Sequence, residues 1–203
     1  MIPIFRPLLF SALLLAPAAA QSFKLNGPLE REPSGRFLLP QTSPDGRYVV
    51  YAAAQEGDHY GLYSVAASDK PTPVRLSPTV RTQFQITPLG KDVILLELDP
   101  NQLAIVPIDG SSAPRSLSDP GFVRWFQASR DDVHVLYTSD QQTAGVVELF
   151  SVAITGEPPV KVSGPLVPGG DVQTVVLSND GTLALYSADQ DADEVVELYV
   201  VPV

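Results

Sequence analysis

Four stretches of the chain repeat one pattern, in which an apolar segment, a tight turn and a second apolar segment follow one another. The turn positions fall at Gly46, Gly90, Asp132 and Gly181, so the repeats are spaced by 44, 42 and 49 residues. A period in the forties built of strand-like segments is typical of a β-propeller, because one four-stranded blade takes about that many residues and buries its faces only against neighbouring blades. The sequence therefore predicts an all-β fold, a β-propeller with about four blades.

The repeat also predicts the extent of each blade. The first three blades accommodate four strands each, whereas the fourth has no segment for a fourth strand; the predicted blades are residues 36–77, 83–117, 123–162 and 173–203. The closest match to the missing strand lies near the N-terminus, where residues 24–29 (KLNGPL) parallel residues 161–166 (KVSGPL). We therefore expect residues 22–26 to be an orphan fourth strand that closes the ring. Strand exchange in a homodimer and an open, partial propeller are the alternatives.

The first twenty residues have the order of an export signal. Arg6 supplies a positive charge, residues 7–17 are mostly apolar, and Ala18 to Ala20 form a small-residue cleavage site before Gln21. We expect residues 1–20 to be removed as a signal peptide, which leaves residues 21–203 as the propeller without a membrane span. The chain has no cysteine, so neither a disulfide nor a lipid-modified cysteine can form. A periplasmic or secreted location is the expectation.

The charge balance argues against a nucleic-acid partner. The whole chain holds 13 Lys and Arg against 23 Asp and Glu, a formal charge of −10, and loss of Arg6 with the signal makes it one unit more negative. A polyanion needs clustered basic residues, whereas here they are scattered singly among the carboxylates. The charge balance therefore predicts no nucleic-acid partner; the partner expected for this chain is a protein or cell-envelope component.

The clearest turn copies are residues 43–47 (SPDGR) and 178–182 (SNDGT). These repeats resemble the TolB-type, WD-repeat-like propeller repeats of exported bacterial proteins. The resemblance covers essentially all of residues 21–203 and implies the propeller fold. The same repeat also occurs in the propeller domains of prolyl-oligopeptidase-like peptidases. The chain departs from TolB in having no α/β domain before the blades, and from family propellers in having fewer than the usual six or more blades.

Catalytic motifs are missing from the sequence. It contains no Gly-x-Ser-x-Gly elbow, no zinc-protease histidine motif and no phosphate loop. Of the two histidines, His134 lies at a strand position that holds other residue types in the other repeats, and His59 lies in a loop. We therefore expect no catalytic residues, and the chain is predicted not to be an enzyme.

Three glutamines mark the innermost strands. Gln41, Gln85 and Gln127 occupy one repeat position, with Val176 in the fourth repeat. Equivalent amides near the propeller axis can line a channel for a small polar ligand. The favoured alternative is that they bond backbone groups between adjacent blades, as buried amides generally must.

An acidic loop and a group of large side chains are the remaining candidates. Asp189, Asp191 and Asp193 alternate along one loop, as oxygen ligands around calcium often do, although a solvated acidic loop without any cofactor is favoured. Arg81, Arg124 and Trp125 lie where the loops of one propeller face emerge, and such residues are common anchors for protein partners. The alternative for Trp125 is a place in the core.

The favoured function is an exported, non-enzymatic scaffold that binds a protein or envelope component through its loop face. One alternative is the substrate-gating propeller of a larger exported prolyl-oligopeptidase-like hydrolase. Another is a propeller lyase or sugar-binding protein with its site over the axis.

Overall fold

The computed structural model describes residues 22, 24–25, 38–54, 60–68, 70–81 and 83–203. In these ranges the secondary structure is entirely β, and no helix able to cross a membrane occurs there. The predicted signal peptide, residues 1–20, lies outside the described residues, as does His59. The strands are, in chain order, β1 (Leu38–Thr42), β2 (Tyr48–Ala53), β3 (Gly61–Ala66), β4 (Val74–Ser77), β5 (Phe84–Ile86), β6 (Asp92–Glu97), β7 (Gln102–Pro107), β8 (Arg115–Ser116), β9 (Val123–Ala128), β10 (His134–Ser139), β11 (Glu148–Ala153), β12 (Val160–Lys161), β13 (Val172–Leu177), β14 (Leu183–Ala188) and β15 (Glu197–Pro202).

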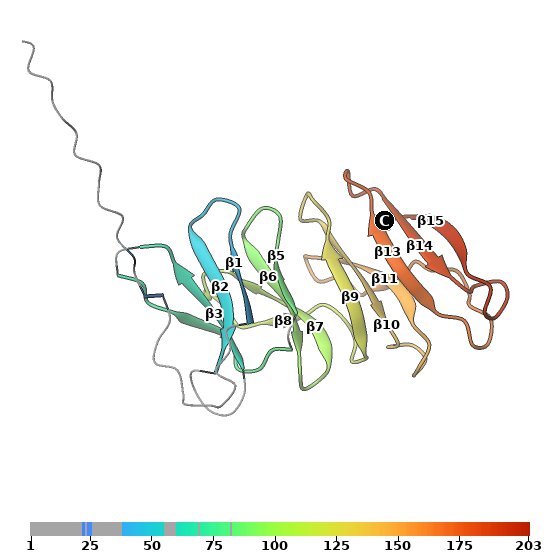
Figure 1. Ribbon diagram of the computed structural model, residues 1–203, viewed down its shortest axis with the longest axis horizontal. Helices are drawn as coiled ribbons and strands as arrows, with labels where there is room; N and C mark the ends of the chain where they lie inside the picture. Colours follow the sequence, from blue (N-terminus) through green and yellow to red (C-terminus); the bar gives the residue numbers. More distant parts are fainter. Residues whose placement is uncertain (1–21, 23, 26–37, 55–59, 69, 82) are drawn as a thin grey trace, which may run out of the picture.

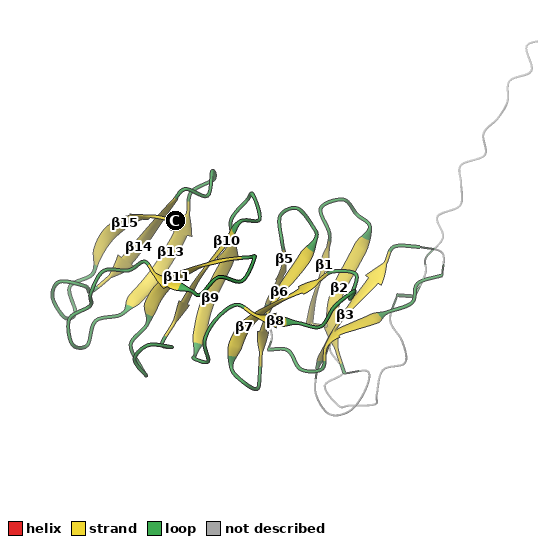
Figure 2. Cartoon of the chain, turned by 180° about the vertical axis from the view of Figure 1, so that it is seen from behind, coloured by secondary structure: helices red, strands yellow, loops and turns green. Residues whose placement is uncertain are grey.

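The strands form four separate antiparallel sheets that follow one another along the chain (Figures 1 and 2). We number them as blades one to four. Blades one to three contain four strands each, in the orders β1-β2-β3-β4, β5-β6-β7-β8 and β9-β10-β11-β12. Blade four is β13-β14-β15, with three strands among the described residues. These four sheets confirm the all-β propeller fold predicted from the repeat.

The blades pack face to face and form one apolar core between each neighbouring pair. Alternation along each strand sends successive side chains to opposite faces, so one strand contributes to two cores. In β6, for example, Val93 and Leu95 pack against blade one, whereas Ile94 and Leu96 pack against blade three. This arrangement explains why the middle strands are continuously apolar instead of alternating.

The sheets do not close into a ring; Figure 1 shows blade one at one end of the row and blade four at the other. Of the expected orphan strand, residues 22, 24 and 25 are described, and they lie outside the strands. Leu25 packs against Tyr51, Tyr63 and their neighbours on the outer face of blade one. Within this chain, therefore, closure by pairing of this segment with β15 is not seen.

The four repeat turns have the conformation that the sequence predicts. Gly46, Gly90 and Gly181 have φ between 72° and 75°, and Asp132 has φ of 56° in the place of a glycine. In three of the turns a serine hydroxyl donates a 2.6 Å hydrogen bond to the aspartate two residues later, from Ser43 to Asp45, from Ser129 to Asp131 and from Ser178 to Asp180. These bonds, with backbone N–H donors, hold the pKa of each aspartate below its usual value of 3.8.

Replacing Ser129 by alanine should lower the melting temperature by about 3 °C at pH 7, because the turn loses its bonds to the backbone and to Asp131. The lowered pKa of Asp131 means that its ionised form stabilises the fold above pH 4 and that this contribution disappears as the pH falls through the folded-state pKa. The difference between wild type and Ser129→Ala should therefore shrink below pH 4, with the exposed Ser112→Ala as control. A difference that stays constant from pH 7 to pH 2.5 would contradict this account.

Candidate functional site

The glutamines of the first strands join adjacent blades. The Gln41 amide nitrogen donates to the carbonyl of Phe84 over 2.9 Å, and its oxygen accepts from the amide of Ile86 over 3.1 Å. The oxygen of Gln85 accepts from the amide of Ala128 over 3.4 Å. These are the bonds between blades that were favoured over a channel site. The amides of Gln41 and Gln85 thus hold successive first strands in register.

Gln127 lies next in this series and borders a cavity. A pocket of about 180 Å³ lies between the turn ends of blades two, three and four, and it is lined by Gln85, Pro88, Gln127, Ala128, Arg130, Leu177, Ser178 and Asn179. Two of the three predicted glutamines therefore border the same small polar pocket. This pocket is too small for most organic ligands, which generally need about 300 Å³ or more.

The acidic loop of blade four is organised by the backbone. Asp189 is buried, and its carboxylate accepts a 2.7 Å hydrogen bond from the amide of Asp171, which lowers its pKa. At the equivalent place in blade three, Asp140 accepts a 2.6 Å bond from the amide of Phe122, which likewise lowers its pKa. Both carboxylates therefore fix the chain just before the first strand of their own blade.

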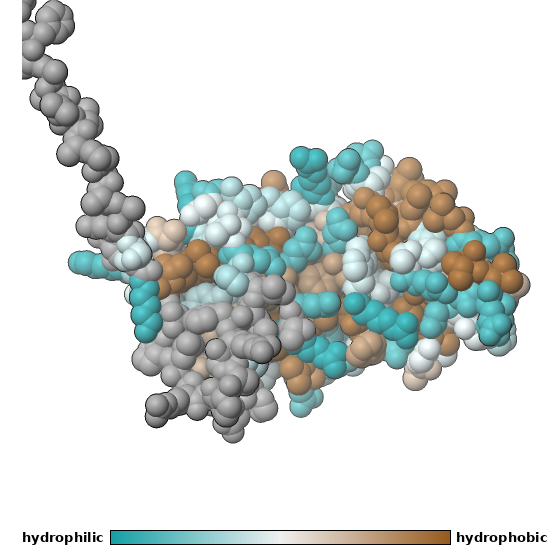
Figure 3. Space-filling model, in the orientation of Figure 1, coloured by the Kyte–Doolittle hydropathy of each residue, from teal (hydrophilic) through white to brown (hydrophobic). Residues whose placement is uncertain are grey.

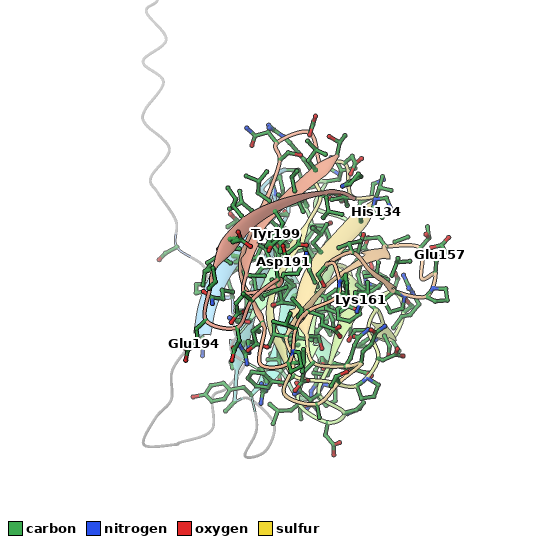
Figure 4. The ribbon with its side chains drawn as sticks, turned by 90° about the vertical axis from the view of Figure 1, so that its right-hand side faces the viewer. His134, Glu157, Lys161, Asp191, Glu194 and Tyr199 are labelled. Carbon is green, nitrogen blue, oxygen red and sulfur yellow. The ribbon has the colours of Figure 1, made fainter. Side chains whose placement is uncertain are left out.

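The other two aspartates of this loop face different partners. Asp193 lies against Gly169: a Cβ atom added to this glycine would lie 2.8 Å from a carboxylate oxygen of Asp193. Asp191 lies beside Tyr199 (Figure 4), whose pKa is raised to about 12 by burial, by the hydrogen bond that its hydroxyl donates to Glu197 and by the negative charge of Asp191. In the described part of the chain, no group of three or more His, Cys, Asp or Glu side chains is arranged to hold a metal ion. Asp189, Asp191 and Asp193 thus have different neighbours, and calcium binding by this loop stays a prediction.

Arg81 and Arg124 come together at the opposite end of the first strands from the repeat turns. They line a pocket of about 350 Å³ between blades two and three; its lining is Arg81, Gln83, Leu96, Phe122, Val123 and Arg124. We refer to it as the arginine pocket. The guanidinium of Arg81 lies 5.2 Å from the centre of the Phe122 ring, a cation–π contact. Phe122 itself is 45% exposed.

Local backbone geometry positions Arg124. The register of β9 against β10 pairs Thr138 with Trp125 but Ser139 with Val123, so Arg124 is the extra residue of a β-bulge. Bulges re-aim side chains and are frequent beside functional sites. Blade four has the same irregularity at Gln173, between the pairs Val172–Ala188 and Thr174–Ser187. Arg124 also forms a 3.7 Å ion pair with Asp171, across the junction with blade four.

Trp125 contacts both the apolar core and a surface pocket. It is partly buried and packs against the apolar core between blades three and four. It also lines a second pocket of about 310 Å³, with Arg124, Thr138, Val172, Gln173, Thr174 and Val175. Arg124 borders both pockets and links them into one surface strip.

Two contributors to this strip were not identified from the sequence. Phe122 and Asp171 each lie directly before the first strand of their blade, at one repeat position. The repeat itself could have identified them, because it places both residues at the loop end next to Arg124. Their contacts cross from one blade to the next, and no local pattern indicates such contacts.

Comparison with known proteins bears on the fold alone. No protein-family model matches the chain, and no curated protein matches it in sequence. Among solved structures, TolB from Acinetobacter baumannii is similar over 81% of this chain and 42% of its own, with a TM-score of 0.52 and 15% identity. A puromycin hydrolase is similar over 83% and 27%, with a TM-score of 0.56 and 20% identity. The tricorn protease is similar over 89% and 18%, with a TM-score of 0.61 and 14% identity.

The chain thus spans less than half the length of each of these three proteins. The similarity is to the propeller repeat that TolB and the peptidase structures share, and blade order and strand pairing agree with it. At such identities the comparison establishes a common fold and no common activity. The chain therefore has the TolB-type β-propeller fold, in the form of an open row of blades.

Proposed function

We propose that the chain is an exported, non-enzymatic β-propeller scaffold that binds a protein or a cell-envelope component through the arginine pocket. The observation that carries the proposal is the grouping of Arg81, Arg124 and the half-exposed Phe122 around one hollow at the loop end of blades two and three. Export is inferred from the signal-like residues 1–20, and the location proposed is the periplasm or the medium.

The chemistry of the arginine pocket favours a partner with an acidic or carbonyl-rich group next to an apolar one. Guanidinium groups form bidentate hydrogen bonds with carboxylates, and Phe122 and Leu96 add apolar contact area. Arg81 stacks on Phe122, which limits the conformations of both side chains before a partner arrives. Such a preformed arrangement reduces the entropy lost on binding.

The proposal is tested by cross-linking the exported chain to its partner in the envelope of the producing cell. Arg81→Ala should reduce the cross-linked product at least about tenfold, because arginine anchors at the centre of an interface often contribute that much. Arg47→Ala is the matched control, since Arg47 is an exposed arginine at the opposite, turn end of blade one, where it pairs with Asp45. An unchanged product with Arg81→Ala would refute the proposed site. Hydrolytic or lyase turnover by the purified chain, abolished by a point substitution, would refute the non-enzymatic role.

A second candidate is the substrate-gating propeller of a larger hydrolase. It is favoured by the similarity to a puromycin hydrolase and to the tricorn protease, each of which extends well beyond the matched region. The mass of the natural gene product decides between the two candidates. A mass close to that of residues 21–203 favours the scaffold, and a product with a further catalytic domain favours the hydrolase.

A further inference from the structure

The outer edge of β15 lacks the neighbour that the equivalent strands have. In blades one to three, β3, β7 and β11 each pair with a fourth strand, whereas no described residue pairs with the outer side of β15. In blade three, the amide of Leu149 donates to Ser163 and its carbonyl accepts from Val162. Leu198 of β15 occupies the same repeat position. An unpaired strand edge of this kind is a template for pairing with another chain.

The outer face of blade four is apolar and exposed. Leu136 and Leu149 of blade three are fully buried against blade four, but their repeat equivalents Leu185 and Leu198 are 41% and 70% exposed. Val176 and Val200 lie in the same cross-strand row as Leu185, and each is more than 60% exposed. Figure 3 shows apolar surface gathered at this end of the molecule. These positions have the composition of an interface between blades.

Leu25 lies on blade one at the place that corresponds to that of Val162 on blade four. Val162 packs in the core that contains the stacked pair of Tyr186 and Tyr199. Leu25 packs in the cluster that contains the equivalent stacked pair of Tyr51 and Tyr63. The N-terminal segment therefore lies on blade one as a fourth strand arriving from a preceding blade would lie.

The charged residues beside these strands also correspond between blade three and the open end of blade four. Lys161 of the fourth strand forms a 2.8 Å ion pair with Glu148 of β11. The residues at the same repeat positions are Lys24 and Glu197, and both are exposed. Glu197 accepts a 3.0 Å hydrogen bond from Tyr199, which lies two residues later on β15. Figure 4 views this end of the row and shows Tyr199 on it.

We propose that a second copy of this chain completes blade four, with its Lys24 and Leu25 alongside the outer edge of β15 and its Lys24 paired with Glu197. Leu25 is seated on blade one, and blade four lies at the opposite end of the row, so the two ends of one chain do not meet (Figure 1). In a dimer, blade four of each chain meets blade one of the other chain, which gives two identical junctions. The product is a closed ring of eight blades with twofold symmetry, the commonest symmetry of soluble oligomers.

Both junctions bury the exposed face of blade four. Leu185 and Leu198 then face the Tyr51–Tyr63 pair of the other copy, as Leu136 and Leu149 face blade four within one chain. Tyr51 and Tyr63 are already buried in the single chain, at 3% exposure each, so they gain little further burial at the junction. The gain in apolar burial comes from the face of blade four.

Charge reversal tests the pairing and distinguishes two chains from one. Sedimentation velocity of the purified exported chain should give the mass of a dimer. Lys24→Glu alone and Glu197→Lys alone should each raise the dimer dissociation constant at least about tenfold, because each places like charges at both junctions. An equimolar mixture of the two variants should recover the dimer, since every junction of the mixed ring then pairs opposite charges.

Lys70→Glu, a charge reversal at another exposed lysine, is the control and should leave the dimer intact. Circular dichroism of each variant checks that it folds, as expected for substitutions at exposed positions. A wild-type chain that stays monomeric at all concentrations would overturn the proposal. A dimer that neither charge reversal weakens would also overturn it. The same holds if the dimer is recovered by the double variant Lys24→Glu/Glu197→Lys but not by the mixture of the two single variants. None of these outcomes depends on the arginine pocket.

Discussion

Replacing Lys161 by methionine is expected to lower the free energy of unfolding by about 3 kcal/mol, because the substitution leaves the buried carboxylate of Glu148 without its charge partner. Glu148 is 5% exposed, and one of its oxygens receives the 2.8 Å hydrogen bond from Lys161. The other oxygen is buried without a hydrogen-bond partner among the described residues. Loss of the ammonium group therefore leaves the carboxylate with neither its charge partner nor access to water.

Urea unfolding at pH 7 measures this loss, with Lys91→Met as the control at an exposed lysine. The double variant Glu148→Gln/Lys161→Met should recover part of the stability, because it removes the buried charge together with its partner. If Lys161→Met unfolds like the wild type, or if the double variant is less stable than the single one, the ion pair does not stabilise blade three as described.

A matched pair of leucines gives the second large effect. Leu149→Ala should cost about 3 kcal/mol, because Leu149 is fully buried between blades three and four and its removal leaves a cavity. Leu198→Ala, at the same repeat position in blade four, should cost less than about 0.5 kcal/mol in the monomer, because Leu198 is 70% exposed. Denaturant unfolding of the dilute, monomeric chain provides both numbers. Equal costs at the two positions would mean that the outer face of blade four is covered within a single chain.

The sequence predicts those parts of this fold that depend on local chemistry. A tight turn between two strongly apolar segments recurs at a regular spacing, and the structure has a turn between the first two strands of each sheet at these positions. The repeat also predicts a turn at Asp132, which has φ of 56°; aspartate tolerates positive φ better than most side chains.

The site depends on contacts between blades, which no local pattern specifies. The bulge at Arg124 arises from the register of β9 against β10, and the Arg81–Phe122 contact joins two blades. The bond from the amide of Asp171 to the carboxylate of Asp189, eighteen residues later, is another contact that the sequence pattern does not specify. Likewise, the sequence marks Lys24 and Leu25 as strand-like, but only the structure shows Leu25 against Tyr51 and Tyr63.

The central claim is that the chain forms a row of four TolB-type blades and that no described residue pairs with the outer edge of the last one. Residue-resolved amide hydrogen exchange on the chain, diluted until it is monomeric, tests it most directly. The amide of Leu149, which donates to Ser163, should exchange slowly. The amide of Leu198, at the same position on the open edge of β15, should exchange at least about a hundredfold faster. Equal protection of Leu149 and Leu198 in the monomer would contradict the account, because it would require a fourth strand beside β15 in the same chain.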